Sequence, residues 1–275
     1  MYDKQNDKVV IDGKLLTSNK KNHPETEINI KTSDPQDTDI KPYFNIKSSK
    51  NPQIEKYLPW KKDDENYAPY TFSQEYANCT LEELRNRPQP VQRTLEWYKY
   101  RYGMLTASDL HKVETLGKRN SLLKEKAKPF EMRRRGRPPS GPLYHGVKYE
   151  EVATMIYEAR NNVKILEFGC IQHKTLPIFG ASPDGICDEN SGPLSGRMLE
   201  IKCPYSRKIT GIVPPYYWAQ VQGQLEVCEL YECDFFECKL VEYEDKEDYE
   251  ADGGESRTAK GKEKGVIITM YDTTK

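Results

Sequence analysis

The chain has 275 residues, of which 36% are hydrophobic, and a formal net charge of −1; its mean hydropathy is −0.87. No apolar run approaches the length of a membrane span and no secretory signal is recognisable, so we do not expect a membrane or secreted protein. Seven cysteines then indicate free thiols in an intracellular, reducing compartment. Cys228, Cys233 and Cys238 are evenly spaced, but without a Cys-x-x-Cys pair buried thiols are favoured over an iron–sulfur or zinc site.

Composition divides the chain into two parts. Residues 1–70 are rich in Lys, Asn, Asp, Ser, Thr and Pro and show no sustained periodicity, so we expect a disordered or extended N-terminal arm. Residues 71–275 form the folded domain. Ten Lys and Arg against three Glu between residues 112 and 137 predict a basic insertion at about 112–140. Eight acidic residues against one Lys between 242 and 255 predict an acidic loop at about 242–262.

Hydrophobic periodicity and turn residues give the expected elements of the folded domain. The helices alternate with strands in an order that predicts an α/β fold with a mixed central β-sheet flanked by helices. Helices are expected at 80–84 with Thr80 as N-cap, at 91–101 before Gly103, from 106 onward, at 143–160 and at 216–228. Strands are expected at 163–171, 176–179, 198–203, 233–243 and 265–271.

Two carboxylates and a lysine stand out around the strand at 198–203. Glu200 and Lys202 point to the same face of that strand because side chains alternate, while Leu199, Ile201 and Cys203 point into a core. Asp184 lies in Ser-Pro-Asp-Gly, a turn from which the chain can return beside the strand. Two adjacent carboxylates repel unless a cation lies between them, and such oxygens suit Mg²⁺ or Mn²⁺. The residues alone leave a surface ion pair open as the alternative.

A second group of residues surrounds the expected helix end near Gly103. Arg101 ends one helix, and Ser108 lies at the start of the next. A helix N-terminus offers free N–H groups, and an arginine adds a planar fork, so together they would form a seat for a phosphate group. A solvated Arg101 and a simple capping role for Ser108 are the alternative.

Five motifs follow one another over about residues 91–240: Trp97-x-x-x-Arg101-x-Gly-x-x-Thr-Ala-Ser108, Gly146-x-x-x-Glu150-x-x-Ala, Ser-Pro-Asp184-Gly, Glu200-Ile-Lys202-Cys-Pro and Tyr217-x-x-Gln220-x-Gln222. Their residues and order resemble those of the lambda exonuclease and YqaJ-type viral recombinase family. The sequence looks most like the members of that family that large eukaryotic DNA viruses carry. The resemblance implies a restriction-endonuclease-like core and a metal-dependent deoxyribonuclease that digests double-stranded DNA ends 5′ to 3′ in viral recombination, replication or repair.

The resemblance also implies a role for each matching residue. Mg²⁺, with Mn²⁺ able to substitute, would be bound by Asp184, Glu200 and the Ile201 backbone carbonyl, and Lys202 would align or activate the attacking water. Glu150 would act with a second metal or its waters. Gln220 would contact metal-bound water or DNA. Arg101 and Ser108 would hold the 5′-terminal phosphate.

The basic segment contains Arg134-Arg135-Gly136-Arg137-Pro138, which resembles the core of a minor-groove hook. A phosphate-binding loop beside the nuclease cleft, a solvated linker and a nuclear import signal remain alternatives for Arg134, Arg135 and Arg137.

Double-stranded DNA is the expected partner. Family resemblance adds a single-strand annealing or replication protein and a ring-forming trimer, in a host nucleus or a cytoplasmic viral factory. Two other functions stay open at this point: a structure-selective endonuclease using the same site, and a DNA-binding recruitment module built on a nuclease scaffold. Because all the predicted metal-binding residues are present, an enzyme is favoured over the recruitment module.

Overall fold

The computed structural model describes residues 7–11, 14–16, 25–32, 43–47, 74–131 and 140–270. None of the helices in those ranges combines the length and apolarity that crossing a bilayer requires. The helices are α1 (Gln74–Asn86), α2 (Leu95–Tyr102), α3 (Leu110–Val113), α4 (Leu116–Lys126), α5 (Pro142–Asn161), α6 (Pro215–Cys228) and α7 (Lys246–Ala251). The strands are β1 (Asp7–Ile11), β2 (Lys14–Leu16), β3 (Glu25–Thr32), β4 (Tyr43–Lys47), β5 (Leu105–Thr106), β6 (Ile165–Leu166), β7 (Ile171–Gln172), β8 (Phe179–Ala181), β9 (Gly185–Cys187), β10 (Met198–Lys202), β11 (Glu232–Glu237), β12 (Leu240–Glu242) and β13 (Lys264–Met270).

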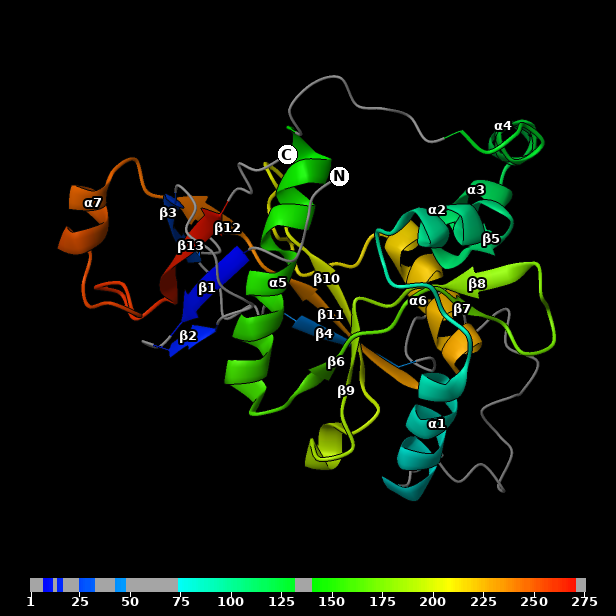
Figure 1. Cartoon of the computed structure of the whole chain (residues 1–275), viewed down its shortest axis with the longest axis horizontal. Helices are drawn as coiled ribbons and strands as arrows, with labels where there is room; N and C mark the ends of the chain where they lie inside the picture. The colour runs from blue at the N-terminus through cyan, green and yellow to red at the C-terminus, as the bar shows by residue number, and fades with distance from the viewer. Residues whose placement is uncertain are drawn as a thin grey trace.

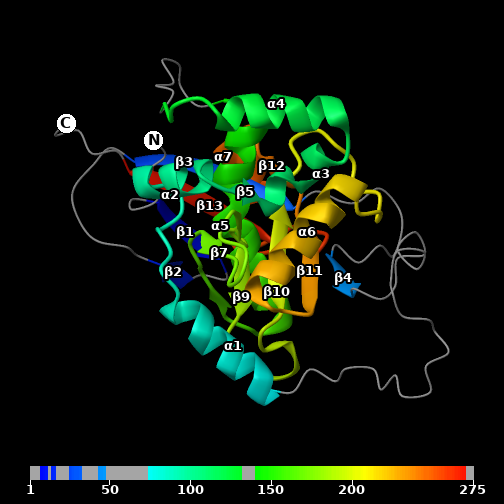
Figure 2. The same cartoon turned by 90° about the vertical axis from the view of Figure 1, so that its right-hand side faces the viewer.

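A mixed five-stranded sheet forms the centre of the molecule, in the order β4-β11-β10-β9-β6. Strands β10 and β11 are parallel, whereas β9 and β4 pair antiparallel to them. Helix α5 lies on one side of this sheet and α6 on the other (Figures 1 and 2). The prediction of an α/β fold with a mixed central sheet flanked by helices is therefore confirmed.

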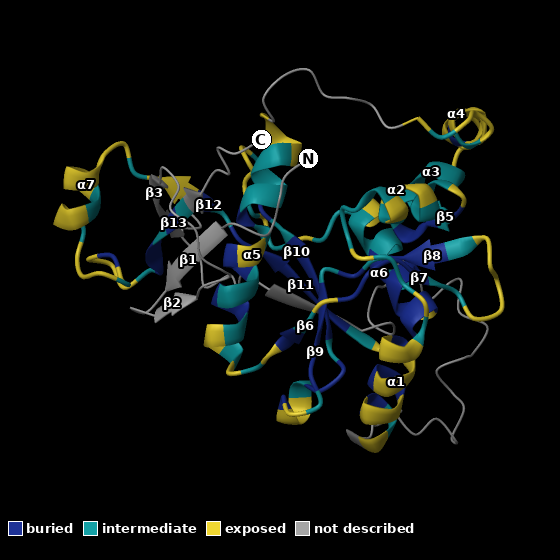
Figure 3. Ribbon diagram, viewed as in Figure 1, coloured by how far each residue is buried: buried dark blue, intermediate teal, exposed yellow. Residues whose placement is uncertain are grey.

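The two faces of β10 bury different groups. Leu199, Ile201 and Cys203 pack in one core cluster with Tyr149 and Ile156 of α5. The other cluster joins α6 to the opposite face of the sheet. The strands between the helices are almost wholly buried (Figure 3). This alternation places Glu200 and Lys202 on the α6 face, as expected from strand geometry.

Within residues 1–70, the segment expected to form a disordered or extended arm, the structure describes four short strands. Strands β1, β2 and β3 join β12 and β13 in an antiparallel sheet, and β4 pairs with β11 at the edge of the central sheet. Short strands need no core of their own when they extend a sheet built elsewhere in the chain, so local periodicity did not reveal them.

Several element boundaries also differ from the prediction. Thr80 lies inside α1 rather than at its N-cap, and the helix expected from residue 91 begins at Leu95 behind the N-cap Thr94, although Gly103 ends it as expected. The strand expected over 163–171 is divided into β6 and β7 in different sheets. Gly169 lies at the break, where a Cβ would approach the Pro90 carbonyl oxygen to 2.1 Å.

Both charged segments contain helices. The basic segment at about 112–140 includes α4, and the acidic segment at about 242–262 includes α7, which protrudes from the far side of the molecule from α4 (Figure 1). Asp245 caps α7 by accepting from the backbone N–H of Asp248 at 2.8 Å. The seven cysteines are free, and Cys228, Cys233 and Cys238 are buried. Burial raises the pKa of Cys228 to about 12.

An ion pair between α5 and the segment before β13 predicts how stability depends on pH. Arg160 donates to both carboxylate oxygens of Glu263, each at 2.7 Å. Burial alone would raise the pKa of Glu263, but Arg160 outweighs burial and lowers it to about 2 from 4.5. The stabilisation is therefore complete above pH 4.5 and is lost as pH falls through about 2.

We expect Glu263→Gln to lower the free energy of unfolding at pH 7 by about 2 kcal/mol, less than the full pKa shift because Arg160 remains partly in water. Urea titrations at pH 7 and pH 3 measure this difference, and it should shrink at the lower pH. Glu250→Gln, which alters an exposed pair with Lys246, is the control. A constant difference between the two pH values would contradict this account.

Candidate active site

The structure brings Asp184 to the edge of β10. Asp184 lies in the turn between β8 and β9, and β9 pairs antiparallel with β10. The carboxylate of Asp184 accepts a hydrogen bond from the Ile201 backbone N–H at 2.7 Å. The turn and the strand therefore meet beside Glu200 and Lys202, as the sequence pattern required.

Glu200 is only 1% exposed, and three hydrogen-bond donors fix its carboxylate. Lys202 donates to Glu200 Oε1, and Gln220 Nε2 donates to the same oxygen at 2.6 Å. Gln224 Nε2 donates to Oε2 at 2.7 Å. Gln220 and Gln224 are four residues apart on α6 and share one helical face. Gln220 thus contacts a carboxylate of the predicted metal set, and Gln224 has the same role on the other oxygen.

The charges at this site are strongly coupled. Burial raises the pKa of Asp184 well above its usual value, and the neighbouring charge of Glu200 adds to this effect. Burial would lower the pKa of Lys202, but the charges of Glu200 and Asp184 outweigh it and raise that pKa. Lys202 is therefore an ammonium at neutral pH. In this structure it donates hydrogen bonds to Glu200 and to the Ile201 carbonyl oxygen.

The oxygen atoms of the site suit a hard divalent cation. The Lys202 ammonium contacts Glu200 Oε1 and lies 3.1 Å from the Ile201 carbonyl oxygen, so two of the predicted ligand oxygens already converge on one positive charge. Carboxylate and carbonyl oxygens are the ligands that Mg²⁺ and Mn²⁺ prefer. Within the described ranges, no cluster of three His, Cys, Asp or Glu side chains could hold a metal. The predicted set relies on two carboxylates and a backbone carbonyl instead.

Glu150 reaches the same site from α5, but a residue that the sequence did not single out holds it. Arg93 Nη2 lies 2.6 and 2.5 Å from the two carboxylate oxygens of Glu150. Arg93 adopts a φ of 67°, a left-handed conformation that is uncommon for residues other than glycine. Its Nη1 is buried without a hydrogen-bond partner in the described part of the chain. No motif signals this role, because the residue lies in an irregular turn before α2.

Arg101 and Ser108 form the second group, and Ser182 joins them. Arg101 donates to Ser182 Oγ at 3.0 Å and to Ser108 Oγ at 3.2 Å. Its guanidinium lies 4.3 Å from the centre of the Trp97 ring, and Trp97 Nε1 also donates to Ser182. The Ser-Pro-Asp-Gly motif contained the signal for Ser182, because a serine two residues before Asp184 in a turn lies close to that carboxylate.

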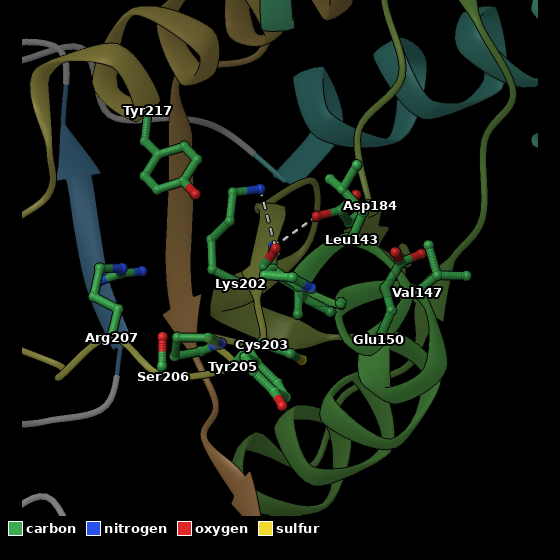
Figure 4. Close-up of a pocket in the computed structure, with 14 residues that line it drawn as sticks. Leu143, Val147, Glu150, Asp184, Lys202, Cys203, Tyr205, Ser206, Arg207 and Tyr217 are labelled. Carbon is green, nitrogen blue, oxygen red and sulfur yellow. Dashed lines mark hydrogen bonds between the residues drawn. The ribbon is translucent and has the colours of Figure 1, made fainter. Parts of the chain in front are cut away.

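A cavity of about 280 Å³ joins these two groups. Arg101, Ser108 and Ser182 line one part of it, and Asp184, Glu200, Lys202, Gln220 and Glu150 line the other. A second cavity, of about 460 Å³, lies between α5 and the loop after β10. Asp184, Lys202 and Glu150 line this cavity as well, and Figure 4 shows Lys202 between Arg207 and Glu150. The predicted hydrolytic residues therefore lie where two cavities meet.

The basic-hook residues cannot be placed in this arrangement. Arg134, Arg135 and Arg137 lie outside the described residues. The hook, the phosphate-binding loop and the linker stay predictions.

Comparison with known proteins gives the family. A stretch of 217 residues, 71% of this chain, is 39% identical to the uncharacterised protein R354 of Acanthamoeba polyphaga mimivirus and spans 38% of that protein's length. Crystal structures of LHK-Exo, an alkaline exonuclease from Laribacter hongkongensis, one of them with dAMP, match with a TM-score of 0.44 and 25% identity, over 55% of this chain and 83% of theirs. The resemblance inferred from the motifs is confirmed, because residues 96–231 match the YqaJ-like viral recombinase domain.

Proposed function

We propose that this chain is a Mg²⁺-dependent deoxyribonuclease that releases nucleotides from the ends of double-stranded DNA in the 5′ to 3′ direction, with Mn²⁺ able to substitute. One observation carries the proposal: a single cavity is lined both by Arg101 and Ser108 and by Asp184, Glu200 and Lys202. A terminal phosphate bound at Arg101 would set a fixed separation between the strand end and the cut. This arrangement favours cleavage at ends over cleavage within a duplex.

Each residue has a defined part in this reaction. Asp184, Glu200 and the Ile201 carbonyl would hold the metal, which would neutralise charge on the scissile phosphate and make water a better nucleophile. Gln220 and Gln224 keep the Glu200 carboxylate in one orientation. Lys202, as an ammonium, would position the attacking water or a phosphate oxygen through its N–H groups.

Glu150 would complete the site from the α5 side. Its carboxylate is held by Arg93 at 2.5 Å, so it faces the shared part of the two cavities in a fixed orientation. There it would hold the water shell of a second metal ion. In this proposal, Arg93 is the residue that positions Glu150.

Substrates with and without ends test the proposed function. We expect a 5′-phosphorylated linear duplex to be degraded in Mg²⁺ with release of the 5′ label first, and a covalently closed circular duplex of the same sequence to remain intact. Chelation by EDTA should stop the reaction, and Mn²⁺ should restore it. Gel analysis of both substrates in one tube provides an internal control.

Three results would contradict the proposal. Nicking of the closed circle would indicate a structure-selective endonuclease using the same residues. Binding of the linear duplex without any cleavage in Mg²⁺ or Mn²⁺ would indicate a DNA-binding recruitment module. Release of a 3′ label before the 5′ label would reverse the polarity.

A further inference from the structure

Arg207 lies in the wall of the second cavity, five residues beyond Lys202 in the loop that follows β10. Its Nη2 lies 2.5 Å from Glu237 Oε1, and its side chain is 36% exposed. A guanidinium carries five N–H donors, so one ion pair leaves most of them free. Within the described residues this contact is an ion pair without hydrogen-bond geometry, because both carboxylate oxygens of Glu237 lack a hydrogen-bond partner there. The side chain is thus anchored at one nitrogen and open to the cavity at the others.

The anchor itself is unusual. Glu237 ends β11 with 0% exposure and follows the apolar residues Phe235 and Phe236. It pairs in register with Lys202 on the neighbouring parallel strand. Burying a carboxylate costs several kcal/mol unless a partner compensates for it, and an apolar residue would fill the same position more cheaply. The ion pair with Glu237 explains why Arg207 is held in place. It does not explain why a buried acidic residue occurs at this strand end, beside the predicted catalytic lysine.

The two cavities define the course of a DNA strand. A terminal phosphate at Arg101 would lie in the smaller cavity, and the first internucleotide phosphate would lie at Asp184 and Lys202, where the cavities meet. The rest of the strand would then continue into the larger cavity. Arg207 stands there on the opposite side of Lys202 from Glu150 (Figure 4). A planar fork held by a carboxylate is well suited to bind a phosphate.

We propose that Arg207 binds the second internucleotide phosphate of the cleaved strand, counted from the 5′ end, and that Glu237 positions its guanidinium for this contact. The larger cavity is then the seat of the strand that remains after the cut. This inference rests on the proposed function, since the counting of phosphates begins at the Arg101 seat. It assigns the binding of a phosphodiester group to a residue outside the matched family motifs.

Binding of chemically modified duplexes tests the inference. The probes are 5′-phosphorylated duplexes in which one internucleotide phosphate of the labelled strand, at the first, second, third or fourth position, is a neutral methylphosphonate. Fluorescence anisotropy without divalent cations reads affinity and requires no cleavage. For the wild-type chain, neutralising the second phosphate should weaken binding about 10-fold, the worth of one charge-assisted contact.

The variant pair is chosen so that folding does not obscure the result. Arg207→Ala alone would leave Glu237 buried and uncompensated, so the test uses Arg207→Gln combined with Glu237→Gln, with thermal unfolding as the check on folding. This double variant should bind the second-position probe and the unmodified duplex equally well, while its penalties at the other positions remain. Arg85→Gln, in which the changed arginine forms a 2.5 Å ion pair with Glu189 on the surface, should behave as the wild type.

The inference is overturned if the folded double variant keeps the full penalty at the second position, or if its penalties fall equally at all positions. The first result would mean that Arg207 only neutralises Glu237 and does not contact the second phosphate. The second result would mean that Arg207 attracts DNA through its charge without binding one particular phosphate. Because the readout is binding, a wild-type chain that binds with this pattern but does not cleave in Mg²⁺ would overturn the proposed function and leave the Arg207 contact standing.

Discussion

Replacing Lys202 by alanine is expected to lower the rate of nucleotide release from a linear duplex in Mg²⁺ by about 1,000-fold, as for loss of one positioned electrostatic donor. Lys202 contacts Glu200 and the Ile201 carbonyl, so in the proposed reaction its ammonium would lie where the attacking water and the scissile phosphate meet. Duplex binding should change by less than about tenfold, because other cations of the two cavities remain. Single-turnover assays with end-labelled DNA measure the rate, and anisotropy measures the binding.

The control for this prediction removes a lysine far from the site. Lys246 on α7 is 66% exposed and, among the residues that the structure describes, pairs only with Glu250 of its own helix, so Lys246→Ala should cleave at the wild-type rate. The Lys202 variant should also retain its fold, since Gln220 and Gln224 continue to satisfy Glu200. Cleavage within about threefold of the wild type by a folded Lys202→Ala chain would remove the lysine from the mechanism.

The core of the site could be predicted from the sequence because its geometry is local. Strand alternation places Glu200 and Lys202 together, and the turn at Asp184 leads into β9, the direct neighbour of β10. Helical spacing likewise places Gln220 and Gln224 on one face of α6. Each of these relations spans a few residues or one strand pair.

The parts that the sequence did not reveal depend on contacts between distant segments. Arg93 meets Glu150 across 57 residues, and Arg207 meets Glu237, at the end of β11, across the whole of α6. The strands of residues 1–70 show the same limit, because the alternation in β4 covers only five residues and does not identify β11 as its partner. Local periodicity does not identify a pairing partner that lies so far away in the sequence.

These non-local contacts share one physical feature, the fixing of a charge at the edge of a cavity. Arg93 and Arg207 each pair with a carboxylate, Arg93 in the lining of the smaller cavity and Arg207 in that of the larger. Such cations lower the cost of bringing a polyanion against the buried acids Asp184 and Glu200. The two arginines would therefore reduce the repulsion between the carboxylates of the site and the phosphates of a DNA substrate, even without a bound metal.

Replacing Arg101 by alanine is expected to slow degradation of a 5′-phosphorylated duplex about 100-fold at subsaturating DNA, the cost of losing a bidentate contact to a dianionic phosphate. Degradation of a 5′-hydroxyl duplex should change by less than about threefold, because no terminal phosphate is lost there. Arg101 donates to Ser182 and Ser108 and stacks on Trp97, so its fork is oriented before DNA arrives. Initial rates on the two duplexes, measured in parallel, give the preference for phosphorylated over hydroxyl ends.

Two further variants separate charge from geometry at this seat. Arg101→Lys keeps the positive charge but lacks the planar fork, so it should recover about a tenth of the wild-type preference for phosphorylated ends. Arg85→Ala, which removes a surface arginine paired with Glu189, should leave the preference unchanged. The hydroxyls of Ser182 and Ser108 retain Trp97 and Thr106 as partners without Arg101, so the alanine variant should stay folded. An equal loss on phosphorylated and hydroxyl ends would show that Arg101 supports the fold or general DNA binding, and the end preference would then need another origin.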